Sequence, residues 1–214
     1  MTIRLNGQTS GYVELEAPAT AGSNTLVLPD GNGTSGQYLQ TNGSGGLSWQ
    51  TVTDTTGWTW DTTGTSLTGS SVTITGIPST ATEILVVARS LSDSGGTNWG
   101  MRAGTSSGVA TSGYASMNYY IGASGGNDVA RTTDAWETYG GAAVQFEFTG
   151  TARLTKMVGN NWTCVASYGL NSTYTNVIHW QGYVELGGAL DRINLFTNSG
   201  SFDSGAVYVH YFSP

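Results

Sequence analysis

The stretch Ala206-Val-Tyr-Val-His-Tyr211 places two valines and a tyrosine at alternate positions, with alanine, tyrosine and histidine between them. Because successive side chains of a β-strand point to opposite faces, this period of two is typical of a strand whose faces meet different environments. Similar runs are Ser71-Val-Thr-Ile-Thr75, Glu83-Ile-Leu-Val-Val-Ala88, Ala143-Val-Gln-Phe-Glu-Phe148, Gln181-Gly-Tyr-Val-Glu-Leu186 and Arg192-Ile-Asn-Leu-Phe196. Together these runs predict an antiparallel, jelly-roll-like β-sandwich over residues 58–214.

Shorter runs of the same kind come before residue 52. They are Tyr12-Val-Glu-Leu-Glu16, Thr25-Leu-Val-Leu28, Tyr38-Leu-Gln40 and Leu47-Ser-Trp-Gln50, separated by turn-forming residues. Strands this short are stable only when they pack on something else. We therefore expect an N-terminal module over residues 1–52, a Thr/Gly/Asp-rich linker at 52–57, and packing of the module on sister chains. The candidate assembly residues are Leu15, Leu26, Leu28, Leu39, Leu47 and Trp49.

The composition of the 214 residues supports a folded all-β chain and excludes several classes of protein. Only 10% of the residues are charged, the net charge is −7, and Lys156 is the single lysine, so no basic stripe is available for nucleic acid. No window combines helix formers with helical periodicity, and no apolar run approaches the ~20 residues that span a bilayer. Residues 1–11 do not have the pattern of a secretory signal. A single cysteine, Cys164, excludes an intrachain disulfide.

Several segments resemble proteins of tailed bacteriophages. Residues 15–29 and 36–49 resemble, in order and spacing, a module of phage fibre proteins. Residues 74–78, 102–114, 190–196 and 202–208 are similar to C-terminal domains of phage and prophage tail proteins. The resemblance implies a virion component, commonly a homotrimer, that is assembled in the host cytoplasm and stands on the tail or the capsid.

These observations lead to one main expectation and two alternatives. We expect a non-enzymatic tail fibre or spike subunit whose N-terminal module contacts other virion proteins and whose sandwich presents loops to a host-surface glycan or protein. The first alternative is a capsid-anchored head fibre or decoration protein. The second is an enzyme that degrades surface polysaccharide. No cofactor or metal is needed for the main expectation, and no membrane insertion is expected.

Aromatic residues near Gly/Ser/Asn-rich segments are the candidates for ligand contact. Aromatic side chains beside polar neighbours suit stacking on sugars and protein hot spots. The simpler interpretation is that individual members close the ends of the sandwich or fill contacts between subunits. The set consists of Trp99, Tyr114, Tyr119, Tyr120, Trp136, Trp162, Tyr168 and Tyr174.

Several short motifs match the sequence patterns of catalytic or ligand-binding sites, but turns or packing within the sheets explain them better. Gly31-Asn-Gly-Thr-Ser-Gly36 matches dinucleotide-binding spacing but is expected to form a turn, because no helix follows. Gly104-Thr-Ser-Ser-Gly108 matches a nucleophile elbow, yet its setting lacks a helix, and His179 and His210 are expected to pack within sheets. Asp30, Asn32 and Thr34 fit a solvated turn better than a calcium loop. The polysaccharide-degrading alternative depends on carboxylate pairs, with Glu14/Glu16 and Glu147/Glu185 as the examples.

Overall fold

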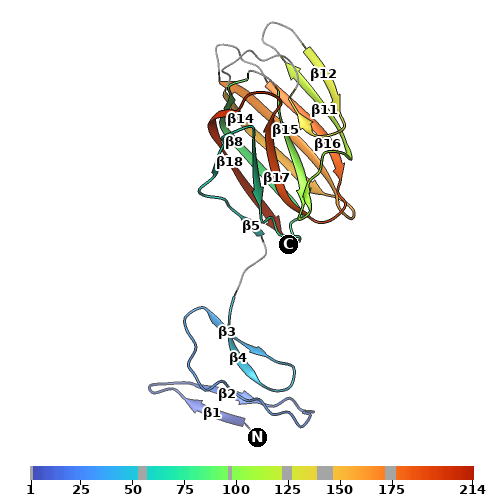
Figure 1. The fold of residues 1–214 in the computed structure, drawn as a ribbon. Coiled ribbons are helices and arrows are strands. Elements are labelled where there is room, and N and C mark those ends of the chain that lie inside the picture. The colour runs from blue at the N-terminus through green and yellow to red at the C-terminus, as the bar shows by residue number, and fades with distance from the viewer. Residues whose placement is uncertain (1, 53–56, 96–97, 122–126, 139–146, 172–176) are drawn as a thin grey trace. The chain divides into compact units, whose positions relative to one another are not determined.

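The computed structural model describes residues 2–52, 57–95, 98–121, 127–138, 147–171 and 177–214. The chain divides into two compact units, Met1–Asp54 and Thr55–Pro214 (Figure 1), and the division falls within the expected linker. Every regular element of the described residues is a β-strand, and every strand pair is antiparallel. The predicted all-β class is therefore confirmed. No helix long and apolar enough to cross a membrane occurs among these residues.

The N-terminal unit consists of two hairpins. Strand β1 (Thr2–Asn6) pairs with β2 (Tyr12–Glu16), and β3 (Gln37–Thr41) pairs with β4 (Leu47–Thr51). The run 25–28, predicted as a strand, forms only a single bridge from Val27 to the β3–β4 turn. Leu26 and Leu28 are therefore not held on one face of a sheet by regular hydrogen bonds to a neighbouring strand.

The first hairpin has one apolar and one polar face. Directly opposed residues of an antiparallel pair share a face, so the register of β1 and β2 gathers four apolar side chains on one side. On the other side, the Arg4 guanidinium pairs with Glu14 and lies 4.0 Å from the centre of the Tyr12 ring. The residues of the apolar face, which are each 60–65% exposed, are Ile3, Leu5, Val13 and Leu15.

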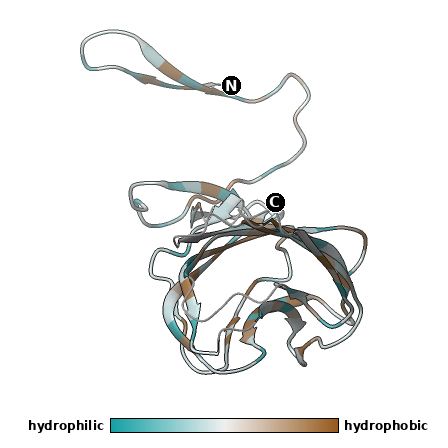
Figure 2. Cartoon of the chain, turned by 90° about the horizontal axis from the view of Figure 1, so that it is seen from above, coloured by the Kyte–Doolittle hydropathy of each residue, from teal (hydrophilic) through white to brown (hydrophobic). Residues whose placement is uncertain are grey.

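The larger sheet of the C-terminal unit has the strand order β12-β11-β16-β15-β14-β8-β18-β5, and β6 also pairs with β18. It curls like half of a barrel (Figure 2). Its middle is a meander of three successive strands, β14 to β16, which needs only short connections. The strands are β5 (Gly57–Thr59), β6 (Thr65–Ser66), β8 (Glu83–Asp93), β11 (Tyr114–Ile121), β12 (Asn127–Thr132), β14 (Glu147–Lys156), β15 (Asn161–Asn171), β16 (Val177–Glu185) and β18 (Phe202–Ser213).

The smaller sheet has the order β10-β9-β17-β7, and β13 also pairs with β9. The chain passes between the two sheets at β7–β8–β9 and again at β16–β17–β18, so each sheet is built from distant parts of the sequence. Buried residues of both sheets form one apolar cluster, which confirms the predicted sandwich. The strands are β7 (Ser71–Thr75), β9 (Trp99–Thr105), β10 (Gly108–Val109), β13 (Trp136–Glu137) and β17 (Leu190–Thr197).

Aromatic contacts join the two sheets. Trp99 of β9 meets Tyr168 of β15 at a ring-centre distance of 4.9 Å and Trp180 of β16 at 5.1 Å, both edge to face. Phe148 of β14 contacts the same indole at 5.8 Å. Because such pairs add about 0.5–1.5 kcal/mol each beyond the area they bury, this group stabilises the sandwich across its middle.

The curvature of the larger sheet coincides with irregular pairing. The ladder between β8 and β18 shifts register twice between Phe202 and Ala206. Ser90 of β8 has a φ of 51°, and Gly205 of β18, with a φ of 104°, lies against the backbone of this bulge. Bulges bend a strand and increase its local twist, so this pair of strands turns the sheet around the smaller one.

Candidate functional site

Five of the eight predicted contact aromatics lie in the core. They were expected on loops, but the structure places them in strands with inward-facing side chains, where they are 0–4% exposed. These buried side chains pack between the sheets, and their role in binding stays a prediction: Trp99, Tyr114, Trp136, Trp162 and Tyr168.

The other three candidates have different positions. Tyr119 lies on the outer face of β11 and is 38% exposed. Tyr120, the next residue, is partly buried and packs against the core. Tyr174 lies outside the described residues. Of the predicted aromatics that the structure describes, Tyr119 is the one whose exposure fits a role in binding.

The predicted assembly residues are mostly exposed in the single chain, so their side chains are available for contact with another chain. Leu15, Leu26 and Leu28 are 63–69% exposed, whereas Leu39 is less exposed and Leu47 and Trp49 are partly buried. The Trp49 indole N–H donates to the carbonyl of Gly31 at 2.6 Å, so this ring holds the preceding loop against the second hairpin. Their association with sister chains stays a prediction.

A group of exposed apolar and polar side chains covers the outer face of the larger sheet at its β12-β11-β16-β15 end. Cross-strand register places Arg131, Met117, Gln181 and Val165 in one row, and Val129, Tyr119 and His179 in the next. Tyr183 lies two residues beyond Gln181 on β16 and is 47% exposed. We call this surface the tyrosine face: Met117, Tyr119, Val129, Arg131, Val165, His179, Gln181 and Tyr183.

Two adjoining hollows lie on the tyrosine face. The larger, of about 640 Å³, extends from Arg131 on β12 to Thr163 on β15. The smaller, of about 330 Å³, includes Tyr119 and His179. Both hollows are lined by Met117, Val165 and Gln181, so together they form one shallow depression across four strands.

The depression carries positive charge, although the protein as a whole is acidic. The chain carries a net charge of −7, yet neither hollow is lined by a carboxylate, and Arg131 is the charged residue in the lining. Among the ion pairs of the described residues, none includes Arg131, whereas Arg153 further along the same row pairs with Glu83. The tyrosine face therefore offers one uncompensated cation beside amide, hydroxyl and imidazole groups.

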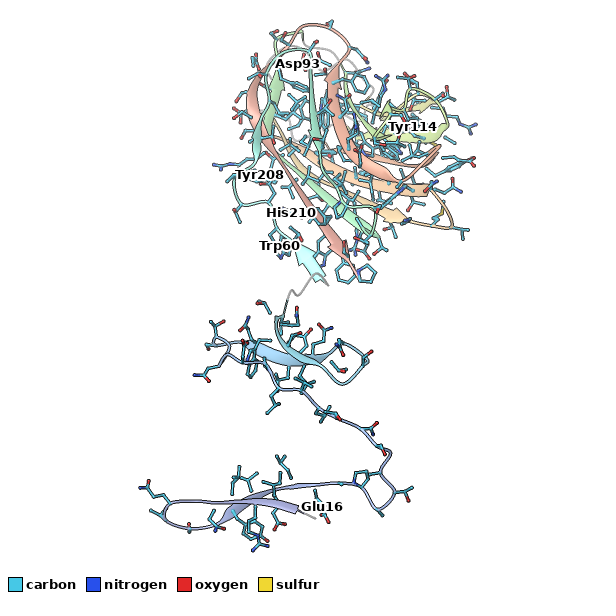
Figure 3. All side chains as sticks on the ribbon, turned by 60° about the horizontal axis from the view of Figure 1, so that its bottom comes forward. Glu16, Trp60, Asp93, Tyr114, Tyr208 and His210 are labelled. Carbon is cyan, nitrogen blue, oxygen red and sulfur yellow. The ribbon has the colours of Figure 1, made fainter. Side chains whose placement is uncertain are left out.

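A second aromatic surface lies at the other edge of the sheet. Trp58 of β5 stacks on Trp60 with ring centres 5.6 Å apart, and Trp60 lies 4.8 Å from the His210 ring (Figure 3). The backbone N–H of Asp61 donates to His210 Nδ1 at 2.9 Å. Trp60 is 59% exposed, but both carboxylate oxygens of the adjacent Asp61 already accept hydrogen bonds from backbone N–H groups. This edge is therefore less suited to polar recognition than the tyrosine face.

Glu147, Glu185 and Ser106, three of the residues considered for catalysis, do not have the geometry that their proposed roles require. Glu147 and Glu185 lie at opposite ends of the β14–β16 meander, about 30 Å apart along the strands, which is too far for two acids to flank one bond. Ser106 lies in the turn between β9 and β10, so a strand follows it instead of a helix. No cluster of three or more metal-ligating side chains occurs in the part of the chain that the structure describes.

The segment 31–36 also leads into a strand. It turns directly into β3, without the helix that dinucleotide binding requires. Gly33 has a φ of 67°, and a side chain at this position would meet the Trp49 ring at 2.7 Å. The glycine is required for the turn over this indole, which supports the structural interpretation.

Comparison with known proteins does not assign the chain to a family. No protein-family model, no curated protein and no solved structure matches the chain. The fold and surface alone define its class: an all-β protein with a thin, apolar-faced N-terminal unit and a sandwich that exposes the tyrosine face.

Sequence reasoning missed most of the tyrosine face. His179, Gln181 and Tyr183 occupy alternate positions of β16, between the buried Ile178, Trp180 and Val184. This alternation of polar and apolar residues is visible in the sequence. What it does not show is that β11, which precedes β16 by some 50 residues, pairs with it in the sheet, and that β12 pairs with the other side of β11.

Proposed function

We propose that this chain is a homo-oligomeric structural subunit of a bacteriophage particle, of the tail fibre or spike kind, which attaches the particle to the host surface. The proposal starts from the resemblance of residues 15–29 and 36–49 to a phage fibre module. The observation that carries it is the exposed apolar face of the first hairpin, joined by a linker to a sandwich that has its own core. Such a unit gains stability by association.

The exposed area is of the size that association requires. Ile3, Leu5, Val13 and Leu15 of the hairpin, with the neighbouring run 26–28, provide seven large apolar side chains that are each 60–69% exposed. At the order of 100 Å² each, they would bury about 700 Å² per chain, close to the ~800 Å² per partner of a standard stable interface. Sister chains of a trimer can supply this cover because each carries the same face.

Light scattering of the full chain at micromolar concentration tests the association. We expect a trimer, and we expect Leu5→Asp to yield monomers, because it places a charge in the apolar face. Asn6→Asp is the matched control, since it adds the same charge one residue away on the polar face. A wild-type chain that is monomeric, or an L5D variant that remains trimeric, would contradict the proposal.

Immunogold labelling of intact particles tests the location. With an antibody against residues 58–214, we expect gold at the tail or its tip. Gold over the head would replace the attachment role with that of a capsid-anchored head fibre or decoration protein. Particles without label would refute a place on the virion surface.

A further inference from the structure

The tyrosine face has the shape of a site for an extended ligand. Its two hollows adjoin across four strands and stay open to solvent along the outer face of the sheet, unlike the enclosed pockets that bury most of a small molecule. Tyr119 pairs with His179, and Tyr183 lies four residues further along β16, a separation of about 13 Å. A ligand that contacts both tyrosines is therefore a chain longer than a single ring.

The side chains of this face are suited to sugars. Tyrosine combines an apolar ring face, on which the C–H groups of a sugar can stack, with a polar hydroxyl. Between the two tyrosines, Gln181 offers an amide, and Thr163 and His179 offer further hydrogen-bonding groups within the hollows. A protein partner would also use the aromatic rings, but the core of a protein interface is depleted of charged residues, whereas Arg131 lines the larger hollow.

The charge of the face selects among sugars. Arg131 lies directly opposite Met117 in the β11–β12 register, at the side of the larger hollow. Glu185 points to the same side of the sheet but lies beyond Tyr183 at the end of β16. An anionic group is therefore favoured at the Arg131 end, where a guanidinium can bind a carboxylate through two hydrogen bonds.

We propose that the tyrosine face binds an acidic polysaccharide. Tyr119 and Tyr183 stack on sugar rings, Gln181 contacts hydroxyl groups between them, and Arg131 pairs with a sugar carboxylate. This inference names the ligand class for the proposed attachment function and rests on that function for its biological setting. The binding itself can be tested in the isolated full chain.

Affinity electrophoresis of the full chain is the test, in gels that contain alginate, polygalacturonate or hyaluronan. The carboxyl-reduced form of each polymer is the matched neutral ligand. We expect retardation by at least one acidic polymer and about tenfold weaker retardation by its reduced form. Arg131→Gln should lower the apparent affinity for the acidic polymer about tenfold, because it removes the charged hydrogen-bond donors that face the carboxylate.

Arg153→Gln is the matched control, because it removes the same charge from the same row of the sheet outside the hollows. It should leave the retardation unchanged. Tyr183→Ala should weaken binding to both forms of the polymer, since stacking does not depend on the carboxylate. Thermal unfolding of each variant verifies that the sandwich is intact.

Three results would overturn this proposal. One is equal migration of wild type and variants in every gel. Another is an equal loss of binding in R131Q and R153Q, which would indicate unspecific attraction of a polyanion. The third is a change of oligomeric state in Y183A, which would assign the face to a second copy of the chain. Because gold labelling and the comparison of L5D with N6D do not involve this face, a negative gel leaves the virion proposal standing.

Discussion

Gly182 is a position where a single added methyl group should destabilise the sandwich. It lies in the middle of β16, opposite Ser116 of β11. A Cβ at this glycine would lie 2.4 Å from the carbonyl oxygen of Ala115 and 2.6 Å from Cα of Ser116. Both are backbone atoms of a hydrogen-bonded strand, so Gly182→Ala must push β11 away from β16. Overpacking of this kind costs about 1–3 kcal/mol, and two backbone clashes place the expected loss at about 2–3 kcal/mol.

Urea unfolding followed by tryptophan fluorescence measures this loss, because Trp180 is buried two residues away. For a domain of this size, the loss corresponds to a fall in Tm of about 5–10 °C. Gly187→Ala is the matched control, since no atom lies within 4 Å of its Cβ position. If G182A unfolds within about 0.5 kcal/mol of the wild type, the size expected of an ordinary surface change, the close strand approach is refuted.

Three further predictions concern buried or hydrogen-bonded groups. Burial raises the pKa of the Cys164 thiol, so a thiol reagent at pH 8 should label the chain only in urea; labelling of the folded chain would contradict this burial. The Tyr114 hydroxyl accepts from the backbone N–H of Ala103 at 2.8 Å and donates to its carbonyl, so Tyr114→Phe should lose about 1–3 kcal/mol in urea unfolding, whereas Tyr119→Phe on the exposed face should not. Burial opposes ionisation of Asp61, but hydrogen bonds from three backbone N–H groups outweigh it and lower its pKa; its stabilisation is therefore complete above pH 3.8 and lost as the pH falls through the lower folded value. Urea unfolding of Asp61→Ala should differ from wild type at pH 6 and converge with it in acid, and an equal difference at both pH values would sink this assignment.

The strands that are rich in branched apolar residues could be predicted from the sequence. Ser71–Thr75 was expected with the bounds that β7 has, and the runs at 192–196 and 206–211 lie within β17 and β18. In these runs valine, isoleucine and leucine alternate with polar residues, which is the direct signature of a half-buried strand. The local sequence pattern was sufficient to predict these strands, because burial of one face produces the alternation of apolar and polar residues.

The strands that hold the buried aromatics could not be predicted in the same way. In β15, inward-facing Trp162, Cys164, Ala166 and Tyr168 alternate with small or polar residues such as Thr163. Glycine, serine and asparagine have low strand propensity, so these stretches suggested loops. The small inward-facing residues Cys164 and Ala166 lie between Trp162 and Tyr168, and bulky and small side chains interdigitate in a close-packed core. The contacts between the two sheets join residues that are distant in sequence, and the tyrosine face was missed for the same reason.

The pairing of β5 determines how the C-terminal unit would respond to a pulling force. The strand has three residues, and its register partners are Ser213, Phe212 and Tyr211 of β18. Because β5 directly follows the linker, tension between an anchored N-terminal unit and a tethered sandwich loads these pairs first. They would part in succession from Gly57 while the larger ladder between β8 and β18 stays intact. Peeling of β5 would lengthen the connection between the two units before the larger ladder between β8 and β18 bears the load.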